Sequence, residues 1–264
     1  MVGIDLTDDF TQLSYYTESG ELFSVSLSKD PMKYRIPTVL CAIEDTQDWL
    51  FGDEAVAAGD RTDAVRINDL LRLAREDDSR VIFGQSYTAD MLLERYLKRL
   101  LGALKIKAGA EKIRGVVIAV KTPDDNLKRN VSSALELLGI RGNDLKFITH
   151  LESFMYYVVS QNKDIWVNDV GLFDFDTDCF KFYRLSFGRR NTPITIVAES
   201  SDLTARINYS MFKPEEMDRL RYAFEDTASM ILHKQLVSAL YFTGAGFDTA
   251  WADDILKKLE LNIS

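Results

Sequence analysis

The sequence has few residues of the kinds that bind soft metals or form disulfides: two histidines and two cysteines in 264 residues. His150 and His233 have neither a cysteine nor a second histidine at the spacing of a zinc site, so we expect no zinc centre. Cys41 and Cys179 each lie in an apolar stretch, which predicts two buried thiols. Reduced thiols, and a strand pattern that starts at the N-terminus with no signal peptide, favour a cytoplasmic location.

The sequence also lacks an excess of positive charge. It contains 41 acidic and 32 basic residues, which gives a formal net charge of -9. Nucleic acids and anionic lipid surfaces repel a chain of this charge. No apolar run approaches the roughly 18 residues that a membrane-spanning helix requires. We therefore expect neither a nucleic-acid partner nor a membrane partner.

Two similar β-hairpin patterns are present instead. Residues 2–16 (VGIDLTDDFTQLSYY) contain an apolar run, an aspartate, a short turn rich in Asp and Thr, and an alternating strand. The same pattern recurs in residues 166–187 (WVNDVGLFDFDTDCFKFYRLSF), where two strands meet at an acidic turn. Two such hairpins in one chain predict a duplicated core.

Each hairpin is followed by strands and helices, which is typical of an α/β fold. Residues 114–121 (RGVVIAVK) form a β-branched run expected of a strand covered on both faces. These patterns predict two lobes, residues 1–164 and 165–264, each centred on a mixed sheet that begins with an antiparallel hairpin. The mixed and polar segment 60–87 is expected to be a short insertion in the first lobe.

The order of these elements resembles the actin-like ATPase superfamily (actin, Hsp70 and sugar kinases), most closely the Hsp70 nucleotide-binding domain. The resemblance covers most of the chain. Its segments are VGIDLTDDF (2–10), RIPTVLCAIEDTQDWLFGDEAV (35–56), IRGVVIAVKTPDDNLKRNVSSALELLGI (113–140), ITHLESFMYYVVSQ (148–161), GLFDFDTDCFKFYRL (171–185) and ALYFTGAGFDTAWADDIL (239–256). It implies a two-lobe actin-like, ribonuclease H-like ATPase fold that lacks most of the peripheral subdomains. The family has another helix after the last segment, so the second lobe is expected to be truncated at its C-terminus.

The resemblance also implies catalytic candidates. Asp5 and Asp174 stand at the positions of the aspartates that hold Mg²⁺ through water, and Glu152 at that of the glutamate that orients the attacking water. A structural role is the alternative for each of them. Turn aspartates bond to local N–H groups, and an acid in the first turn of a helix is stabilised by the helix dipole.

The cofactor-binding candidates follow in the same way. Thr7 and Thr177 lie in the two segments that resemble phosphate loops, and Gly244 and Gly246 in the segment that resembles the adenosine loop. A turn from strand to helix needs glycine with or without a ligand, so these two glycines also have a structural alternative.

Both phosphate loops depart from the family's pattern. The family's glycines are replaced in Thr7-Asp8-Asp9 and in Asp176-Thr177-Asp178-Cys179. Glycine lets the backbone approach a phosphate closely, whereas a carboxylate at about 4 Å repels a phosphate charge by on the order of 1 to 4 kcal/mol. We therefore expect no cofactor, with ATP and Mg²⁺ as the possibility that the resemblance keeps open.

Three functions fit these patterns. The first is a non-catalytic interaction or scaffold module that binds a protein partner as part of a larger protein. The second is an ATP-binding ATPase with an atypical phosphate site. The third is a divalent-cation module, since carboxylates are hard oxygen ligands. The metal ligands would then be Asp5, Asp8, Asp174, Asp176 and Asp178.

Overall fold

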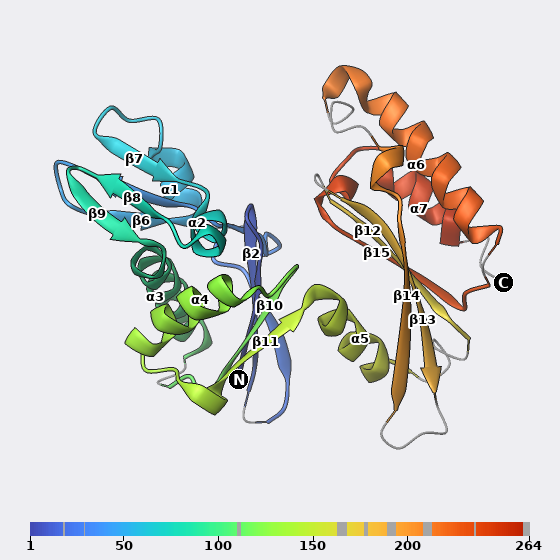
Figure 1. Ribbon diagram of the computed structural model, residues 1–264, viewed down its shortest axis with the longest axis horizontal. Helices are drawn as coiled ribbons and strands as arrows, with labels where there is room; N and C mark the ends of the chain where they lie inside the picture. Colours follow the sequence, from blue (N-terminus) through green and yellow to red (C-terminus); the bar gives the residue numbers. More distant parts are fainter. Residues whose placement is uncertain are drawn as a thin grey trace. The chain divides into compact units, whose positions relative to one another are not determined.

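The computed structural model describes residues 1–17, 19–28, 30–109, 112–162, 168–176, 179–188, 194–207, 213–234 and 236–260. The chain forms two compact units, Met1–Ser153 and Phe154–Ser264 (Figure 1). The sequence placed the division between residues 164 and 165. The structure divides within helix α5 (His150–Ser160), because its later residues pack on a strand of the second unit.

A mixed sheet forms the centre of the first unit. Its strands, in spatial order, are β11 (Leu145–Thr149), β10 (Val116–Val120), β1 (Val2–Leu6), β2 (Phe10–Tyr16) and β3 (Leu22–Val25), with β4 (Ile36–Pro37) also paired to β2. β1 is antiparallel to β2 and parallel to β10, and β10 is parallel to β11. The sheet therefore begins with an antiparallel hairpin, as the sequence predicts.

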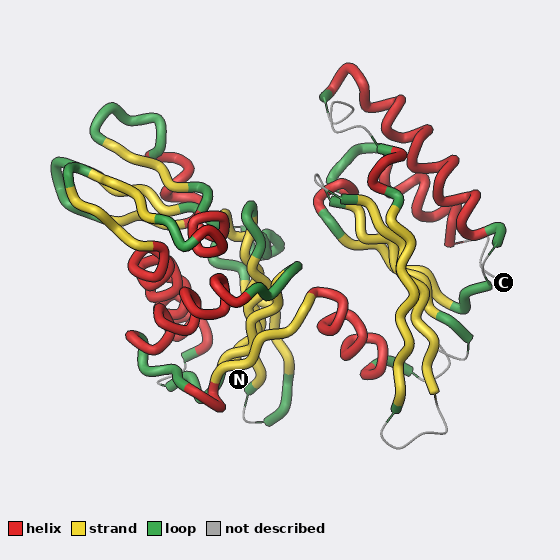
Figure 2. The backbone as a smooth tube through the Cα atoms, viewed as in Figure 1, coloured by secondary structure: helices red, strands yellow, loops and turns green. Residues whose placement is uncertain are grey.

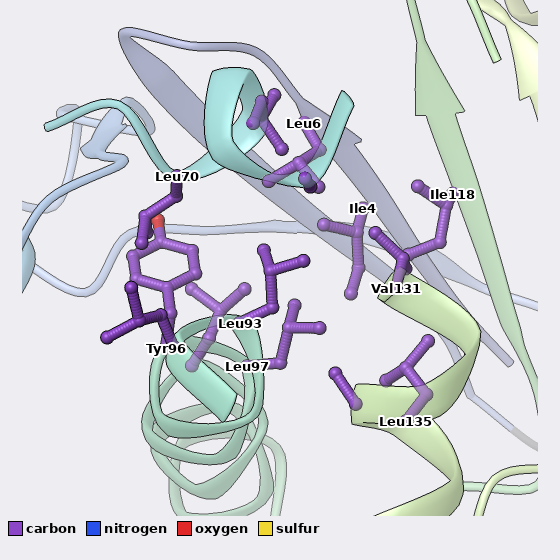
Figure 3. Packing of buried hydrophobic residues seen from close by; sticks show 14 of the residues in the cluster. Ile4, Leu6, Leu70, Leu93, Tyr96, Leu97, Ile118, Val131 and Leu135 are labelled. Carbon is purple, nitrogen blue, oxygen red and sulfur yellow. The ribbon is translucent and has the colours of Figure 1, made fainter. Parts of the chain in front are cut away.

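Helices α3 (Ala89–Ala108) and α4 (Asp125–Leu137) cover one face of this sheet (Figure 1). Successive side chains of a strand point to opposite faces, so Ile4 and Leu6 enter the helix-covered core and Asp5 lies on the other face. Figure 3 shows Ile4 of β1 beside Leu93 and Leu97 of α3.

Smaller elements complete the first unit. They are β5 (Leu40–Ile43), β6 (Trp49–Phe51), α1 (Gly52–Ala58), β7 (Ala64–Ile67), α2 (Leu70–Glu76), β8 (Ser79–Ile82) and β9 (Gln85–Thr88), with a 3₁₀ turn η1 (Gly142–Asp144) before β11. The segment 60–87, which the sequence suggested as a short insertion, contributes to the main core. Ile67, Leu70 and Leu71 are almost completely buried there.

The second unit has one sheet, in the order β14 (Thr195–Asp202), β13 (Phe180–Gly188), β12 (Val170–Phe175) and β15 (Ala239–Thr243). Helices α6 (Met217–Leu232) and α7 (Ala252–Glu260) lie on one side of it (Figure 2). Short 3₁₀ turns are η3 (Thr204–Arg206), η5 (Pro214–Glu216) and η6 (Ala245–Phe247). Phe173 packs against Phe224 of α6 in this core, with ring centroids 5.8 Å apart. Tyr241 of β15 contacts Phe154 of α5, with centroids 5.2 Å apart.

The two sheets repeat one plan. In the first, β10, β1, β2 and β3 lie side by side; in the second, β15, β12, β13 and β14 do so in the same order. The hairpin strands are antiparallel in both, and the added strand is parallel to the first hairpin strand in both. The duplicated hairpin predicted from the sequence is therefore present. Among the described residues, no helix is both long and apolar enough to cross a membrane.

Candidate functional site

Polar side chains collect where the three parallel strands of the first sheet end. Open α/β sheets usually bind ligands outside the carboxyl ends of their parallel strands. β1, β10 and β11 end at Leu6, Val120 and Thr149, so the residues after them share one edge. The polar residues at this edge include Asp5, Thr7, Asp8, Asp124, His150 and Glu152.

Asp5 and His150 form a pair at this edge. Oδ1 of Asp5 lies 2.8 Å from Nε2 of His150, and the side chains are 46% and 31% exposed. The register explains their proximity, since Asp5 is level with Ala119 and Ala119 with Ile148, two residues before His150. From the sequence alone His150 was a candidate only for a zinc site, because its pairing with Asp5 depends on the strand order.

Thr7 holds its own turn. Its hydroxyl donates to the carbonyl of Phe10 at 2.7 Å and accepts from the N–H of Phe10 at 3.0 Å. The N–H of Thr7 also donates to the carbonyl of Phe10, at 3.0 Å. The backbone donor and the hydroxyl that the resemblance assigns to a phosphate are thus used inside the hairpin turn.

Asp8 is paired with Arg75 of α2. Nη1 of Arg75 lies 2.9 Å from Oδ2 of Asp8, and Nε lies 3.6 Å from Oδ2 of Asp124. Asp124 also caps α4 by accepting from the N–H of Leu127 at 2.9 Å. From the sequence alone, Asp8 was expected to repel a phosphate. The structure places one guanidinium against it, from a segment that the sequence had set aside as an insertion.

Glu152 belongs to a capping box. Its carboxylate accepts from the N–H of Thr149 at 2.6 Å, while the hydroxyl of Thr149 accepts from the N–H of Glu152 at 3.0 Å. A Thr-x-x-Glu sequence satisfies two unpaired donors at the start of a helix in this reciprocal way. The structural alternative for Glu152 is therefore present, since one oxygen of its carboxylate accepts from the backbone N–H of Thr149, the residue before α5.

The candidate residues of the second unit lie at the corresponding hairpin. Asp174 is half-buried on β12, level with Lys181 and Thr243. The N–H of Asp176 donates to the carbonyl of Cys179 at 2.8 Å and closes the turn. Thr177 and Asp178 lie outside the described residues.

Gly244 and Gly246 lie against Phe175, the last residue of β12. A Cβ on Gly244 would be 2.1 Å from the carbonyl oxygen of Phe175, and Gly244 has a φ of +109°. A Cβ on Gly246 would be 2.6 Å from the Phe175 ring. Both positions require glycine because of this close approach, which involves no ligand.

The described residues form no cluster of metal-ligating side chains. In the described part of the chain, no group of three or more His, Cys, Asp or Glu residues could hold a metal ion. Asp5 and Asp8 belong to the first unit, and Asp174 and Asp176 to the second. Both cysteines are buried and free, as predicted, and burial raises the pKa of the Cys41 thiol.

Two comparisons with known proteins bear on this arrangement. Residues 21–261 match a protein family described as "Family of unknown function (DUF5716) C-terminal". A search of curated proteins finds no match.

Proposed function

Since the chain belongs to the DUF5716 C-terminal family, whose function is unknown, we propose a function from its own residues: a two-lobe actin-like module that performs no catalysis and binds a partner protein. The repeated strand order supports the two-lobe resemblance. β10-β1-β2-β3 and β15-β12-β13-β14 have the same neighbours and the same strand directions. A duplicated hairpin sheet is what the resemblance implies.

One observation carries the non-catalytic part of the proposal. Groups that the resemblance assigns to the nucleotide are engaged in holding the fold: Thr7 in its turn, Glu152 in a capping box, and Gly244 against Phe175. The hydroxyl proton and the N–H of Thr7 both already donate to the carbonyl of Phe10, so each must break that bond to donate to a phosphate. The exchange costs about what the first bond contributed, roughly 0.5 to 1.5 kcal/mol for a neutral bond and more for a charged one.

Calorimetric titration with ATP and Mg²⁺ tests the proposal. We expect no saturable heat at sub-millimolar nucleotide and no release of phosphate. Saturable binding in the micromolar range would overturn it. If such binding occurs at the turn after β1, Asp5→Ala should abolish it.

A second candidate function, ATP binding at an atypical phosphate site, is favoured by Arg75. Its guanidinium lies against Asp8 and so reduces the repulsion that a phosphate would meet at the turn after β1. A nucleotide held in this way would lose affinity in Arg75→Ala. Arg72→Ala is the matched control, because Arg72 lies on the same helix and pairs with Asp69 and Glu76 instead.

A further inference from the structure

β14 is an outer strand of the second sheet. Among the described strands it pairs only with β13. It runs for eight residues, whereas the outer strands β15 and β3 have five and four. Val197 is 59% exposed, and the strand contains no proline, lysine or arginine. Long edge strands without such residues are templates for pairing with another chain.

The ladder identifies which backbone groups face outward. Leu203 donates its N–H to the carbonyl of Phe180 at 2.8 Å, which makes 180/203 a hydrogen-bonded pair. Hydrogen-bonded pairs alternate along an antiparallel ladder, so 182/201, 184/199 and 186/197 follow. The residues between them direct their N–H and C=O groups to the open edge. They are Ile196, Ala198, Ser200 and Asp202.

The charge of this edge selects the partner. Glu199 is 62% exposed, and its partner Arg184 also lies 3.4 Å from Asp169, so one guanidinium faces two carboxylates. Asp202 lies on the opposite face, level with Lys181, and hydrogen bonds from Thr204 hold the pKa of Asp202 below its ordinary value. The excess of negative charge is therefore on the face of Glu199. With a net charge of -9, a second copy of the chain is repelled and a basic segment is attracted.

We propose that β14 binds an extended segment of a partner protein as an added strand, and that this segment alternates apolar and basic residues. Its backbone would pair with the outward groups of Ile196, Ala198 and Ser200. An alternating segment directs its basic side chains to one face of the sheet, where they would lie beside Glu199. Its apolar side chains would lie on the other face, beside Ile196 and Ala198. Backbone pairing gives affinity in this mode, and alternate side chains give specificity. The inference rests on the proposed function, because it names the chemistry of the partner.

Fluorescence anisotropy of the full chain with a synthetic peptide tests the inference. The probe is a peptide as long as β14 that alternates valine and lysine, with both ends blocked and a dye attached. We expect saturable binding, which Ala198→Pro weakens about tenfold or more, because proline removes one outward N–H and places its ring at the pairing edge. Proline is tolerated in an edge strand where the N–H faces solvent, so circular dichroism should be unchanged. Ala198→Ser keeps the N–H and should bind like the wild type.

Several results would overturn the inference. Equal binding by Ala198→Pro would mean that the peptide does not use the edge. Equal binding of a peptide that alternates valine and glutamate would contradict the preference for basic residues. A dimer that is detected by light scattering and that Ala198→Pro dissociates would mean that the edge pairs with a second copy of the chain.

If Ala198→Pro fails to fold, the peptide itself carries the test. A peptide N-methylated on the groups that face β14 should not bind, and retained binding would overturn the inference. Absence of binding by the unmodified peptide would also overturn it. That outcome does not bear on the absence of catalysis, which the titration with ATP tests separately. A failure of the inference is therefore distinguishable from a failure of the proposed function.

Discussion

At the residue scale, Gly244 is a candidate ligand residue that also packs against β12 in the second unit. Its positive φ is unfavourable for any other L-residue, and a Cβ would meet the backbone of Phe175 at 2.1 Å. We expect Gly244→Ala to reduce the free energy of unfolding by about 2 kcal/mol or more, through strain and displacement of the end of β12. Urea unfolding followed by circular dichroism measures the change.

Gly102 provides the control. It lies within α3, and apart from the neighbouring helix backbone nothing is within 4 Å of where its Cβ would be. Gly102→Ala should stabilise the protein by about 0.5 to 1 kcal/mol, because alanine loses less backbone entropy in a helix. A Gly244→Ala protein as stable as the wild type would contradict the packing explanation and return Gly244 to the candidate ligand residues.

Tyr96 gives the molecule a defined response to alkaline pH. Its hydroxyl donates to Thr11 Oγ1 at 2.9 Å inside the core, and burial raises its pKa to about 12. Because the unfolded chain loses this proton first, with a pKa near 10, the stabilisation is complete below about pH 10 and is lost as the pH rises to about 12. The loss is at most about 3 kcal/mol.

Tyr96→Phe should therefore flatten the decline of stability between about pH 10 and 12, while costing about 1 kcal/mol at neutral pH through the lost hydrogen bond. Tyr156→Phe is the matched control, since Tyr156 is exposed, and its pH profile should follow the wild type. Parallel profiles for Tyr96→Phe and the wild type would contradict the assignment.

At the scale of elements, the capping box of α5 makes a prediction that a catalytic role for Glu152 does not. Thr149→Ala and Glu152→Ala should each reduce the free energy of unfolding by about 1 kcal/mol. Thr149→Ser and Glu152→Gln keep an acceptor and should cost little. The double alanine variant should lose less than the sum, because each residue acts on the same helix start. Additive losses in the chemical-denaturation curves would mean that the two residues act separately.

Local patterns in the sequence predicted many of these elements correctly, because alternation and helix periodicity depend on neighbouring residues. The hairpins of β1–β2 and β12–β13 and the buried β10 are examples. The capping box at Thr149 is also a local pattern, and Thr-x-x-Glu could have revealed the role of Glu152. The actin-like resemblance stays a prediction.

Contacts between distant elements could not be predicted in this way. Asp8 and Arg75 are separated by 67 positions, and Asp5 meets His150 only because β10 lies between β1 and β11. Neither pair leaves a periodic signal in the sequence. The role of α2 in the core was also missed. This helix is short, and the polar residues around it conceal its apolar face in the sequence.

At the scale of the whole molecule, the two large clusters of buried apolar residues share no members. One contains Leu97 and belongs to the first unit; the other contains Phe173 and belongs to the second. Leu97→Ala should cost about 2 to 5 kcal/mol and accelerate amide exchange within residues 1–153. Phe173→Ala should cost about 3 to 5 kcal/mol and act within residues 154–264.

Hydrogen–deuterium exchange with peptide resolution separates the two effects. Peptides from β10 and α3 should respond to Leu97→Ala, and peptides from β12 and α6 to Phe173→Ala. Uniform acceleration along the chain in either variant would contradict two independent cores.

The parallel pairing of β1 with β10 also delays completion of the first sheet while the chain is being synthesised. Val2 pairs with Val116, so at about 5 to 20 residues per second the ribosome needs roughly 6 to 23 s to supply the partner strand. The β1–β2 hairpin can close within microseconds, but the side chains of Ile4 and Leu6 then stay exposed to solvent until α3 and α4 are synthesised. Throughout that interval the growing polypeptide offers holdase chaperones an apolar hairpin with an unpaired edge. Slower translation between residues 17 and 115 would lengthen this exposure without altering a single amino acid of the product.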